Sequence, residues 1–130
     1  MDNIISSGLV LLTYKGKVLL MHKQKSVIDE KEHPWSFIEG IKKKKESIQD
    51  AICRTIEEEA GIQVENIEYV SELCYHAKLT DDNVNKMQRS ENQLLNFFNP
   101  KELSHLFLSK STKEFIFKHR PLISAPSTFA

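Results

Sequence analysis

Residues 40–62 read GIKKKKESIQDAICRTIEEEAGI, and this stretch decides the fold that we predict for the chain. Isoleucine recurs every fourth position from Ile48 to Ile56, a period that places these side chains on one face of a helix. The pattern predicts a helix over residues 47–60. Gly61 ends it, because glycine readily adopts the left-handed backbone conformation that follows many helices. We therefore expect a helix with one buried face at this point of the chain.

Charged side chains in the last two turns of this helix are expected to have different environments. At 100° per residue, Thr55, Glu58 and Glu59 fall within an arc of roughly 100° that overlaps the edge of the apolar face. Two carboxylates held close together and partly desolvated raise each other's pKa, so a bound cation would stabilise them. Arg54 can pair with Glu58 along the helix, whereas Glu57 points away into solvent. An ordinary solvated acidic surface is the alternative interpretation.

The spacing of glycines and charged residues in this stretch resembles the Nudix family. The family pattern is a glycine, five residues, a glutamate, seven residues and then R-E-U-x-E-E-x-G-U, where U is bulky and aliphatic. Thr55 stands where the family has the glutamate after the arginine, and this is the one mismatch. A pattern of this length is far more specific than a short glycine motif. The matching positions are Gly40, Glu46, Arg54, Ile56, Glu58, Glu59, Gly61 and Ile62.

The resemblance implies a hydrolase that acts on a nucleoside diphosphate linked to another group, with Mg²⁺ or Mn²⁺ as cofactor. Such ions prefer carboxylate and carbonyl oxygens, and they neutralise charge that develops on phosphorus. By resemblance, Glu58 and Glu59 are expected to be metal ligands, and the backbone carbonyl of Glu39 is expected to supply another oxygen. Arg54 and Glu46 are expected to hold those carboxylates in position.

The missing glutamate bears most directly on catalysis, because threonine cannot serve as an anion at position 55. Glu57 cannot replace it, since the helical geometry directs that side chain elsewhere. Some relatives place the base on a loop outside the pattern, and Glu91 is the candidate here for a further ligand or base. An exposed loop glutamate is an equal alternative. The expected catalytic residues are Glu58, Glu59, Arg54 and Glu91.

Two further positions are predicted to contact substrate. Lys23 follows an expected strand and could meet a phosphate, although a solvated surface position is the favoured interpretation, and Gly40 is the second candidate. The lysines at 42–45 could attract phosphate, although a solvated loop is the favoured interpretation. The expected partner is a small-molecule nucleotide, for which a noncanonical or oxidised nucleoside triphosphate is one candidate. A Nudix-fold nucleotide-binding or regulatory module that has lost catalysis is the competing hypothesis.

The rest of the chain predicts strands on both sides of the central helix, and hence a Nudix-type α/β/α sandwich with a mixed β-sheet. The polar stretch 80–90 is predicted to be a connection. Residues 1–120 are expected to form a single domain and residues 121–130 a C-terminal tail. The other predicted elements are strands within 4–14, 18–21, 62–76 and 92–98, a helical turn at 100–103, and a helix capped by Ser109 or Ser111 that ends near Lys118.

Composition excludes several classes of function. Among 130 residues, 40% are hydrophobic and 28% charged, which is typical of one globular domain. Eighteen basic and eighteen acidic residues balance, so we expect binding to neither duplex nucleic acid nor anionic membranes. No apolar run approaches the roughly 20 residues that cross a bilayer. Because Cys53 and Cys74 are isolated, reduced thiols and a cytoplasmic location are expected, while the oligomeric state is not predicted.

Overall fold

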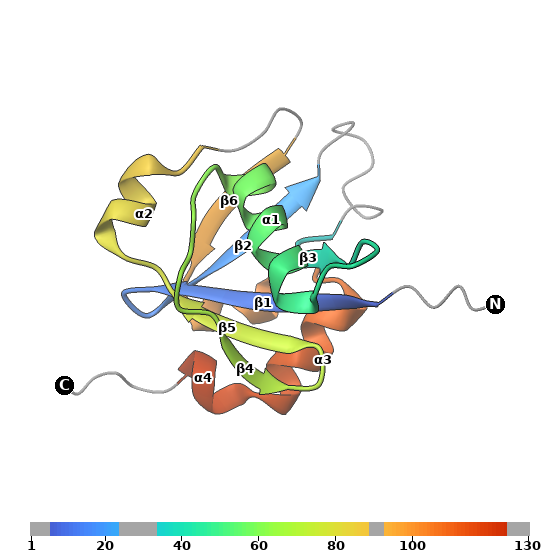
Figure 1. Cartoon of the computed structure of the whole chain (residues 1–130). Helices are drawn as coiled ribbons and strands as arrows, with labels where there is room; N and C mark the ends of the chain where they lie inside the picture. Colours follow the sequence, from blue (N-terminus) through green and yellow to red (C-terminus); the bar gives the residue numbers. More distant parts are fainter. Residues whose placement is uncertain (1–5, 24–33, 89–92, 125–130) are drawn as a thin grey trace.

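A six-stranded mixed sheet forms the centre of the structure, a computed structural model that describes residues 6–23, 34–88 and 93–124 (Figure 1). The strand order is β4-β5-β1-β2-β6, and β3 pairs with β1 beside β2. Only the pairing of β1 with β5 is parallel among the described strands. The strands are β1 (Ser7–Tyr14), β2 (Lys17–Lys23), β3 (Ile38–Ile41), β4 (Glu68–Ser71), β5 (Cys74–Lys78) and β6 (Gln93–Phe98).

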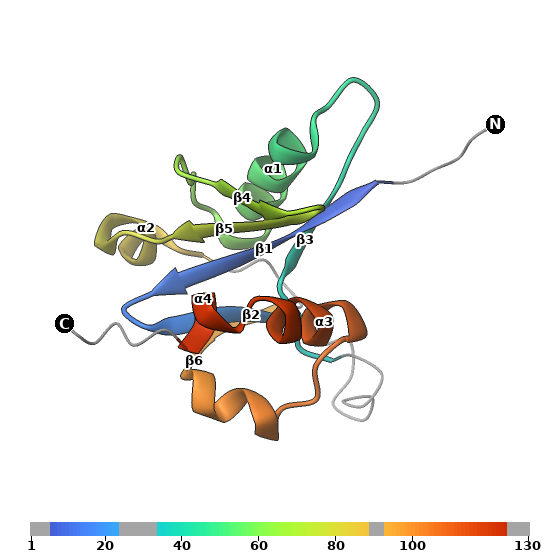
Figure 2. The same cartoon turned by 90° about the horizontal axis from the view of Figure 1, so that it is seen from below.

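Helices cover both faces of this sheet, so the predicted α/β/α sandwich is confirmed. Figure 2 shows α1 on one side of the sheet and α3 and α4 on the other. One hydrophobic cluster fills the space under α1, and a second cluster lies under the C-terminal helices. The helices are α1 (Ile48–Ala60), α2 (Asp81–Lys86), the 3-10 helix η2 (Pro100–His105), α3 (Lys110–Lys118) and α4 (Arg120–Ser124).

The central strand β1 contributes to both clusters, because successive side chains of a strand point to opposite faces. Val10 and Leu12 belong to the cluster under α1, whereas Leu9 and Leu11 belong to the one under η2 and α3. A tight turn joins β1 to β2. Lys15 and Gly16 have positive φ angles of 51° and 81°, which a two-residue hairpin turn of the favoured type requires.

The predicted helix is confirmed as α1, and the predicted end at Gly61 is confirmed with it. At its start, the Ser47 side chain accepts a hydrogen bond of 3.0 Å from the backbone N–H of Asp50. At its end, Gly61 adopts the left-handed conformation at φ 69°, and its N–H donates to the carbonyl of Glu57. Ile52 and Ile56 are fully buried and Ile48 is partly buried, so packing against the sheet holds the helix in place.

Three segments differ from the sequence predictions, and the first is β3 (Ile38–Ile41), which lies outside the predicted strands. The stretch expected to be a plain connection contains α2, which begins with a reciprocal pair of hydrogen bonds between Thr80 and Asn83, each 3.0 Å long. None of its residues is buried, so it leaves no hydrophobic period in the sequence. The prediction of an irregular C-terminal tail from residue 121 is wrong for the first residues of that segment. They form α4, and Ile123 is buried in the second cluster.

Membrane-spanning helices are absent from the part of the chain that the structure describes, since none of its helices is long and apolar enough to cross a bilayer.

Candidate functional site

The site begins where β3 lies directly against the backbone of α1. A Cβ atom added to Gly40 would come within 2.7 Å of the backbone nitrogen and Cα of Ile52 and 2.8 Å of the carbonyl carbon of Ala51. Only glycine fits such a contact, because backbone atoms cannot rotate away as a side chain can. Gly40 therefore has a packing role, and its expected contact with substrate stays a prediction.

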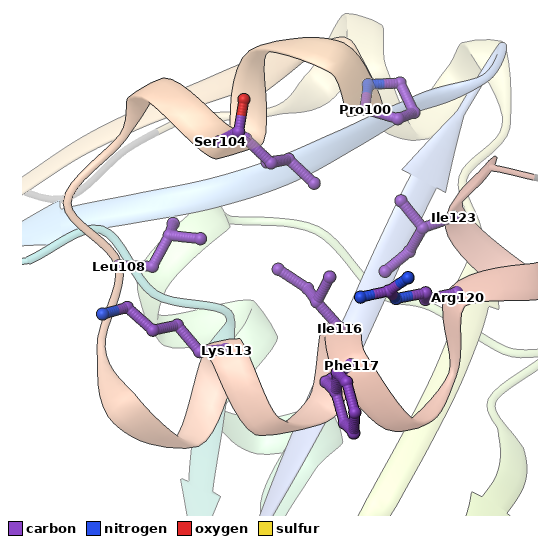
Figure 3. A pocket seen from close by; sticks show the side chains of 9 residues that line it. Pro100, Ser104, Leu108, Lys113, Ile116, Phe117, Arg120 and Ile123 are labelled. Atoms are coloured by element: carbon purple, nitrogen blue, oxygen red, sulfur yellow. The ribbon is translucent and has the colours of Figure 1, made fainter.

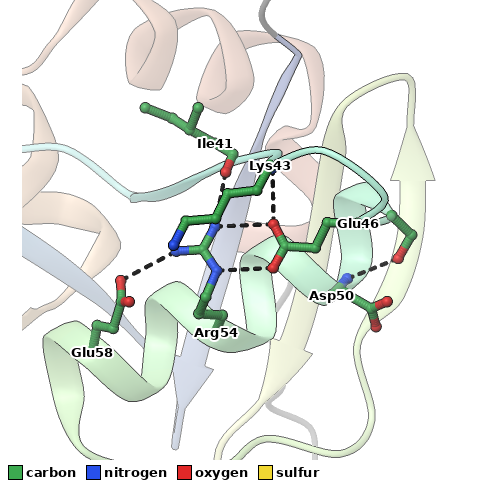
Figure 4. Close-up of polar contacts among 7 residues, drawn as sticks. Ile41, Lys43, Glu46, Asp50, Arg54 and Glu58 are labelled. Carbon is green, nitrogen blue, oxygen red and sulfur yellow. Dashed lines mark hydrogen bonds and ion pairs between the residues drawn. The ribbon is translucent and has the colours of Figure 1, made fainter.

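Arg54 connects three parts of this region (Figure 4). Its Nε donates to Oε2 of Glu46 at 2.8 Å, and its Nη2 donates to Oε1 of the same carboxylate at 3.0 Å. This paired geometry is the strongest that an arginine and a carboxylate form. Nη2 also donates to the backbone carbonyl of Ile41 at 2.9 Å. One guanidinium thus ties the end of β3 and the following loop to α1.

The carboxylate of Glu46 is held in its ionised form. Besides Arg54, the backbone N–H of Lys43 donates to its Oε1 at 2.9 Å. The hydrogen bond from Arg54, followed by the one from Lys43, lowers the pKa of Glu46 from 4.5 to about 2. In return, the hydrogen bond to Glu46 raises the pKa of Arg54. Both groups stay charged at neutral pH, so Glu46 acts as a fixed anion and not as a proton donor.

The predicted pairing of Arg54 with Glu58 is confirmed, although it is long. Nη1 of Arg54 lies 3.4 Å from Oε1 of Glu58, whose side chain is 55% exposed. Glu58 is therefore only partly desolvated. Glu59 is half-buried and Glu57 is exposed as expected. The last turns of α1 therefore present Glu58 toward solvent, with Arg54 limiting its orientation.

Thr55 and the acidic side chains bear on whether a metal ion fits here. Thr55 is buried at 8% exposure, so the position that is a glutamate in the family faces the protein interior. Within the described ranges, no three His, Cys, Asp or Glu side chains gather into a group that could hold a metal ion. The donor chemistry of Glu58 and Glu59 still suits Mg²⁺ or Mn²⁺, which complete their coordination with carbonyl, water and phosphate oxygens. These two residues could supply part of a coordination shell.

The remaining predicted residues are distributed around this centre. Glu39 lies in β3 opposite Leu9, and its carboxylate accepts a hydrogen bond of 2.6 Å from the hydroxyl of Ser7. The role of its backbone carbonyl as a metal ligand stays a prediction. Lys23 is the last residue of β2 and pairs with Gln93, but its side chain is outside the described part. Glu91 also lies outside the described residues.

Several contacts of the site could not have been predicted from the sequence, because they are made by backbone atoms. The carbonyl of Ile41 and the N–H of Lys43 hold Arg54 and Glu46 through backbone atoms, which every residue carries. Similarly, the backbone N–H of Gln88 donates to the carbonyl of Ala60 at 2.8 Å and brings the end of α2 to the end of α1. Only the fold reveals these neighbours.

Comparison with known proteins identifies the family. The profile of the NUDIX domain matches residues 3–125 of the 130. The chain belongs to the NUDIX domain family and thus to the class of the Nudix hydrolases. The resemblance carried by residues 40–62 is thereby confirmed. A comparison with curated proteins gave no match.

Solved structures share the fold at low sequence identity. The solution structure of the E. coli ORF135 protein is 21% identical, with a TM-score of 0.66, over 95% of this chain and 94% of that one. A NUDIX-family hydrolase from Clostridium perfringens is 15% identical, with a TM-score of 0.70, over 95% of this chain and 100% of that one. The NUDIX domain of Shewanella oneidensis NrtR, complexed with ADP ribose, is 14% identical, with a TM-score of 0.70, over 95% and 91%.

Proposed function

We propose that this protein hydrolyses the pyrophosphate linkage of a nucleoside diphosphate derivative, with Mg²⁺ or Mn²⁺ held in part by Glu58 and Glu59. The observation that carries the proposal is the set of contacts made by Arg54 to Glu46, Glu58 and the carbonyl of Ile41. These contacts fix the end of β3, the loop and the acidic end of α1 relative to one another. Catalysis by positioning needs such a rigid frame.

Each residue of the frame has a proposed task. Glu46 keeps the guanidinium of Arg54 in place, and Arg54 limits the orientation of Glu58. The backbone carbonyl of Glu39 is proposed as an additional metal ligand, and Lys23 and Gly40 as contacts to the substrate. When bound, a divalent ion supplies positive charge that neutralises the phosphate oxygens and favours attack by water.

Glu91 is proposed as the base or as a further ligand that compensates for Thr55. The buried threonine cannot contribute an anionic oxygen at its position in α1. Gln88 is hydrogen-bonded to Ala60, which follows Glu59 directly. Glu91 is three residues further along the chain, and three residues span at most about 10 Å. This reach makes contact between Glu91 and the acidic end of α1 sterically feasible.

The proposed substrates are small nucleotides. ADP ribose in the NrtR complex is a nucleoside diphosphate joined to another moiety, and we propose a ligand of this class here. Noncanonical or oxidised nucleoside triphosphates are the other members of the class to be tested. The lysines at 42–45 are all exposed beside Glu46, and their positive charge favours the approach of phosphates.

We also propose a cytoplasmic location for the protein. Cys53 and Cys74 are both free thiols, the usual state in a reducing compartment.

A metal-dependent assay tests the proposed reaction. Release of phosphate or pyrophosphate is measured over a panel of nucleoside triphosphates, oxidised analogues and ADP ribose while Mg²⁺ or Mn²⁺ is titrated. We expect turnover that requires the metal and falls about 10- to 100-fold or more in Glu58→Gln and Glu59→Gln. Glu57→Gln is the matched control, because its side chain lies in the same turn but is exposed away from the site. Equal losses in all three variants would contradict the assignment.

A nucleotide-binding module without catalysis is the second candidate function, and the burial of Thr55 favours it. This alternative predicts that nucleotides raise the thermal unfolding temperature while no product is released at any metal concentration. In that outcome the proposed hydrolysis would be abandoned. If Glu91→Gln alone abolishes turnover and leaves nucleotide binding intact, the threonine has been compensated by the loop glutamate.

A further inference from the structure

The sheet ends in two strands of different character, β4 at one edge and β6 at the other. The strand β4 has only four residues and contains the charged Glu68. Its register with β5 also shifts between Tyr69 and Ser71. Short length, charge and irregular pairing are the usual features that prevent another chain from adding a strand to an edge. The β4 edge is therefore protected against such pairing.

None of these features occurs in β6, whose sequence from residue 93 to 98 is QLLNFF. The strand contains neither a charged residue nor a proline, and its pairing with β2 runs through all six residues without a shift of register. Within the described residues, no strand pairs with its other side. A regular, uncharged edge of this length is a template for a further strand.

The hydrogen bonds of β2 show which backbone groups of β6 face outward. Met21 exchanges two backbone hydrogen bonds with Ser36, so its N–H and C=O point away from β6. Its partner in the register of β2 with β6 is Leu95. In an antiparallel pair that is not hydrogen-bonded, both residues point these groups away from each other, and the direction alternates along the strand. The N–H and C=O groups of Leu95 and Phe97 therefore point to the free edge, and those of Asn96 point to β2.

Side chains of this edge strand are less covered than those of the central strands. The apolar residues of β6, which are Leu94, Leu95, Phe97 and Phe98, are each only partly buried, and Asn96 is exposed. By contrast, the leucines of β1 and β2 are buried. Because removing apolar surface from water is favourable, a strand placed against β6 would be stabilised on both faces of the sheet.

A second copy of β6 is complementary to this edge in one antiparallel register. That register places Asn96 opposite Asn96 of the second copy. Leu95 then lies opposite Phe97 and exchanges hydrogen bonds with it, while Leu94 lies opposite Phe98. A shift by two residues in either direction would set Asn96 against Leu94 or Phe98. The first register alone pairs apolar with apolar side chains throughout, and such cross-strand pairs stabilise sheets.

Charge does not oppose the association of two copies. Eighteen basic and eighteen acidic residues balance, and β6 itself carries no charge. A protein without net charge has no overall electrostatic repulsion from its own copies. Any other partner would have to present an uncharged strand with the same pattern, whereas a second copy presents it by symmetry. A twofold axis uses both edges, so the assembly closes at two chains.

From this arrangement we infer that the chain forms a symmetric dimer by antiparallel pairing of β6 with β6 of a second copy. The twofold axis passes between the two Asn96 residues. Leu95 of each copy exchanges both backbone hydrogen bonds with Phe97 of the other, so the two sheets become one continuous sheet. No residue of β6 belongs to the proposed metal site on α1 and β3, and the inference does not depend on the proposed hydrolase activity.

Sedimentation velocity of the full chain, from about micromolar to about millimolar concentration, tests the inference. We expect a reversible equilibrium between monomer and dimer. Asn96→Lys should raise the dissociation constant about fivefold or more, because two like charges then lie directly opposite each other. A mixture of Asn96→Lys with Asn96→Glu should restore association, since opposite charges then meet at the axis. Asn96 is exposed, so circular dichroism should show both variants folded.

Ser104→Lys is the matched control for the added charge. Ser104 is exposed on η2, the element after β6, and lines a hollow of about 490 Å³ between η2 and α3 (Figure 3). The substitution adds the same charge away from the free edge, so it should change the dissociation constant by less than about twofold. A larger effect of Ser104→Lys than of Asn96→Lys would place the contact at the hollow and overturn the inference.

Amide hydrogen exchange gives a second readout that needs no substitution. The outward N–H groups of Leu95 and Phe97 should exchange more slowly as the protein concentration rises. The N–H groups of Leu94, Asn96 and Phe98 face β2, so they should be protected at every concentration. This alternation along one strand is the signature of pairing at the β6 edge.

Two further results would overturn the inference. One is a monomer over the whole concentration range. The other is association that leaves the exchange of Leu95 and Phe97 unchanged or that is insensitive to Asn96→Lys, because the contact would then lie on another surface.

Discussion

At the scale of single residues, the site depends on the planar, two-pronged side chain of Arg54. Lysine carries the same charge but cannot make two parallel hydrogen bonds to Glu46 while also reaching Ile41. We expect Arg54→Lys to lower kcat/KM about 10- to 100-fold, because Glu58 loses its oriented neighbour. Steady-state kinetics at saturating metal measures the effect. An unchanged kcat/KM would show that Arg54 does not position the catalytic groups.

The shifted pKa of Glu46 predicts how stability changes with pH. Because folding lowers this pKa from 4.5 to about 2, the ionised group stabilises the folded state above its unfolded pKa. That contribution disappears as the pH falls through the folded pKa. Thermal unfolding of the wild-type protein and Glu46→Gln should therefore differ most above about pH 5 and converge toward about pH 2. A difference that is independent of pH would contradict this account.

At the scale of elements, the close contact between β3 and α1 sets the geometry of the site. Gly40→Ala would place a methyl group against the backbone of Ile52, which no rotamer change relieves. We expect the free energy of unfolding to fall by about 1–3 kcal/mol, measured by urea denaturation, together with a loss of turnover. Turnover should fall because the carbonyl of Ile41 would move away from Arg54.

Gly8→Ala is the matched control for this substitution. The added methyl group at position 8 would meet side-chain methyl groups, Cγ2 of Ile48 at 2.7 Å and Cδ1 of Ile52 at 3.0 Å. Those atoms can shift, whereas the backbone atoms beside Gly40 cannot. A smaller loss of stability is therefore expected. If the two variants were equally stable, the strand–helix contact would not be the constraint that selects glycine at position 40.

Elements with a strong hydrophobic period were predictable from the sequence, and elements without one were not. The isoleucine spacing of α1 and the glycine at position 61 predicted the helix to within one residue. By contrast, α2 has no buried residue and depends on the Thr80 cap, so it resembles a loop in sequence. The helix α4 was not predicted, because Pro121 and the neighbouring polar residues are typical of an irregular segment. It forms because Ile123 packs into the core.

The candidate site was predictable to a similar degree. Residue spacing predicted the pairing of Arg54 with Glu58. The family pattern predicted that Glu46 also belongs to the site. The burial of Thr55 and the exposure of Glu58 could not be derived, because both depend on the exact rotation of α1 on the sheet. The backbone groups that complete the site leave no signal in the sequence at all.

At the scale of the whole molecule, the sheet separates two helical layers. The helix α1 lies on one face, and α3 and α4 lie on the other (Figure 2). Any coupling between the two layers would have to pass through the sheet, whose core is closely packed.

The central claim is that the last turns of α1 bind a divalent metal ion. The most direct measurement is a titration of the isotope-labelled protein with Mn²⁺, which broadens the amide signals of residues near the bound ion. We predict broadening that begins at residues 57–61 and 39–41, is lost in Glu58→Gln and Glu59→Gln, and persists in Glu57→Gln. Broadening that is centred elsewhere, or that is unaffected by the first two substitutions, would contradict the account.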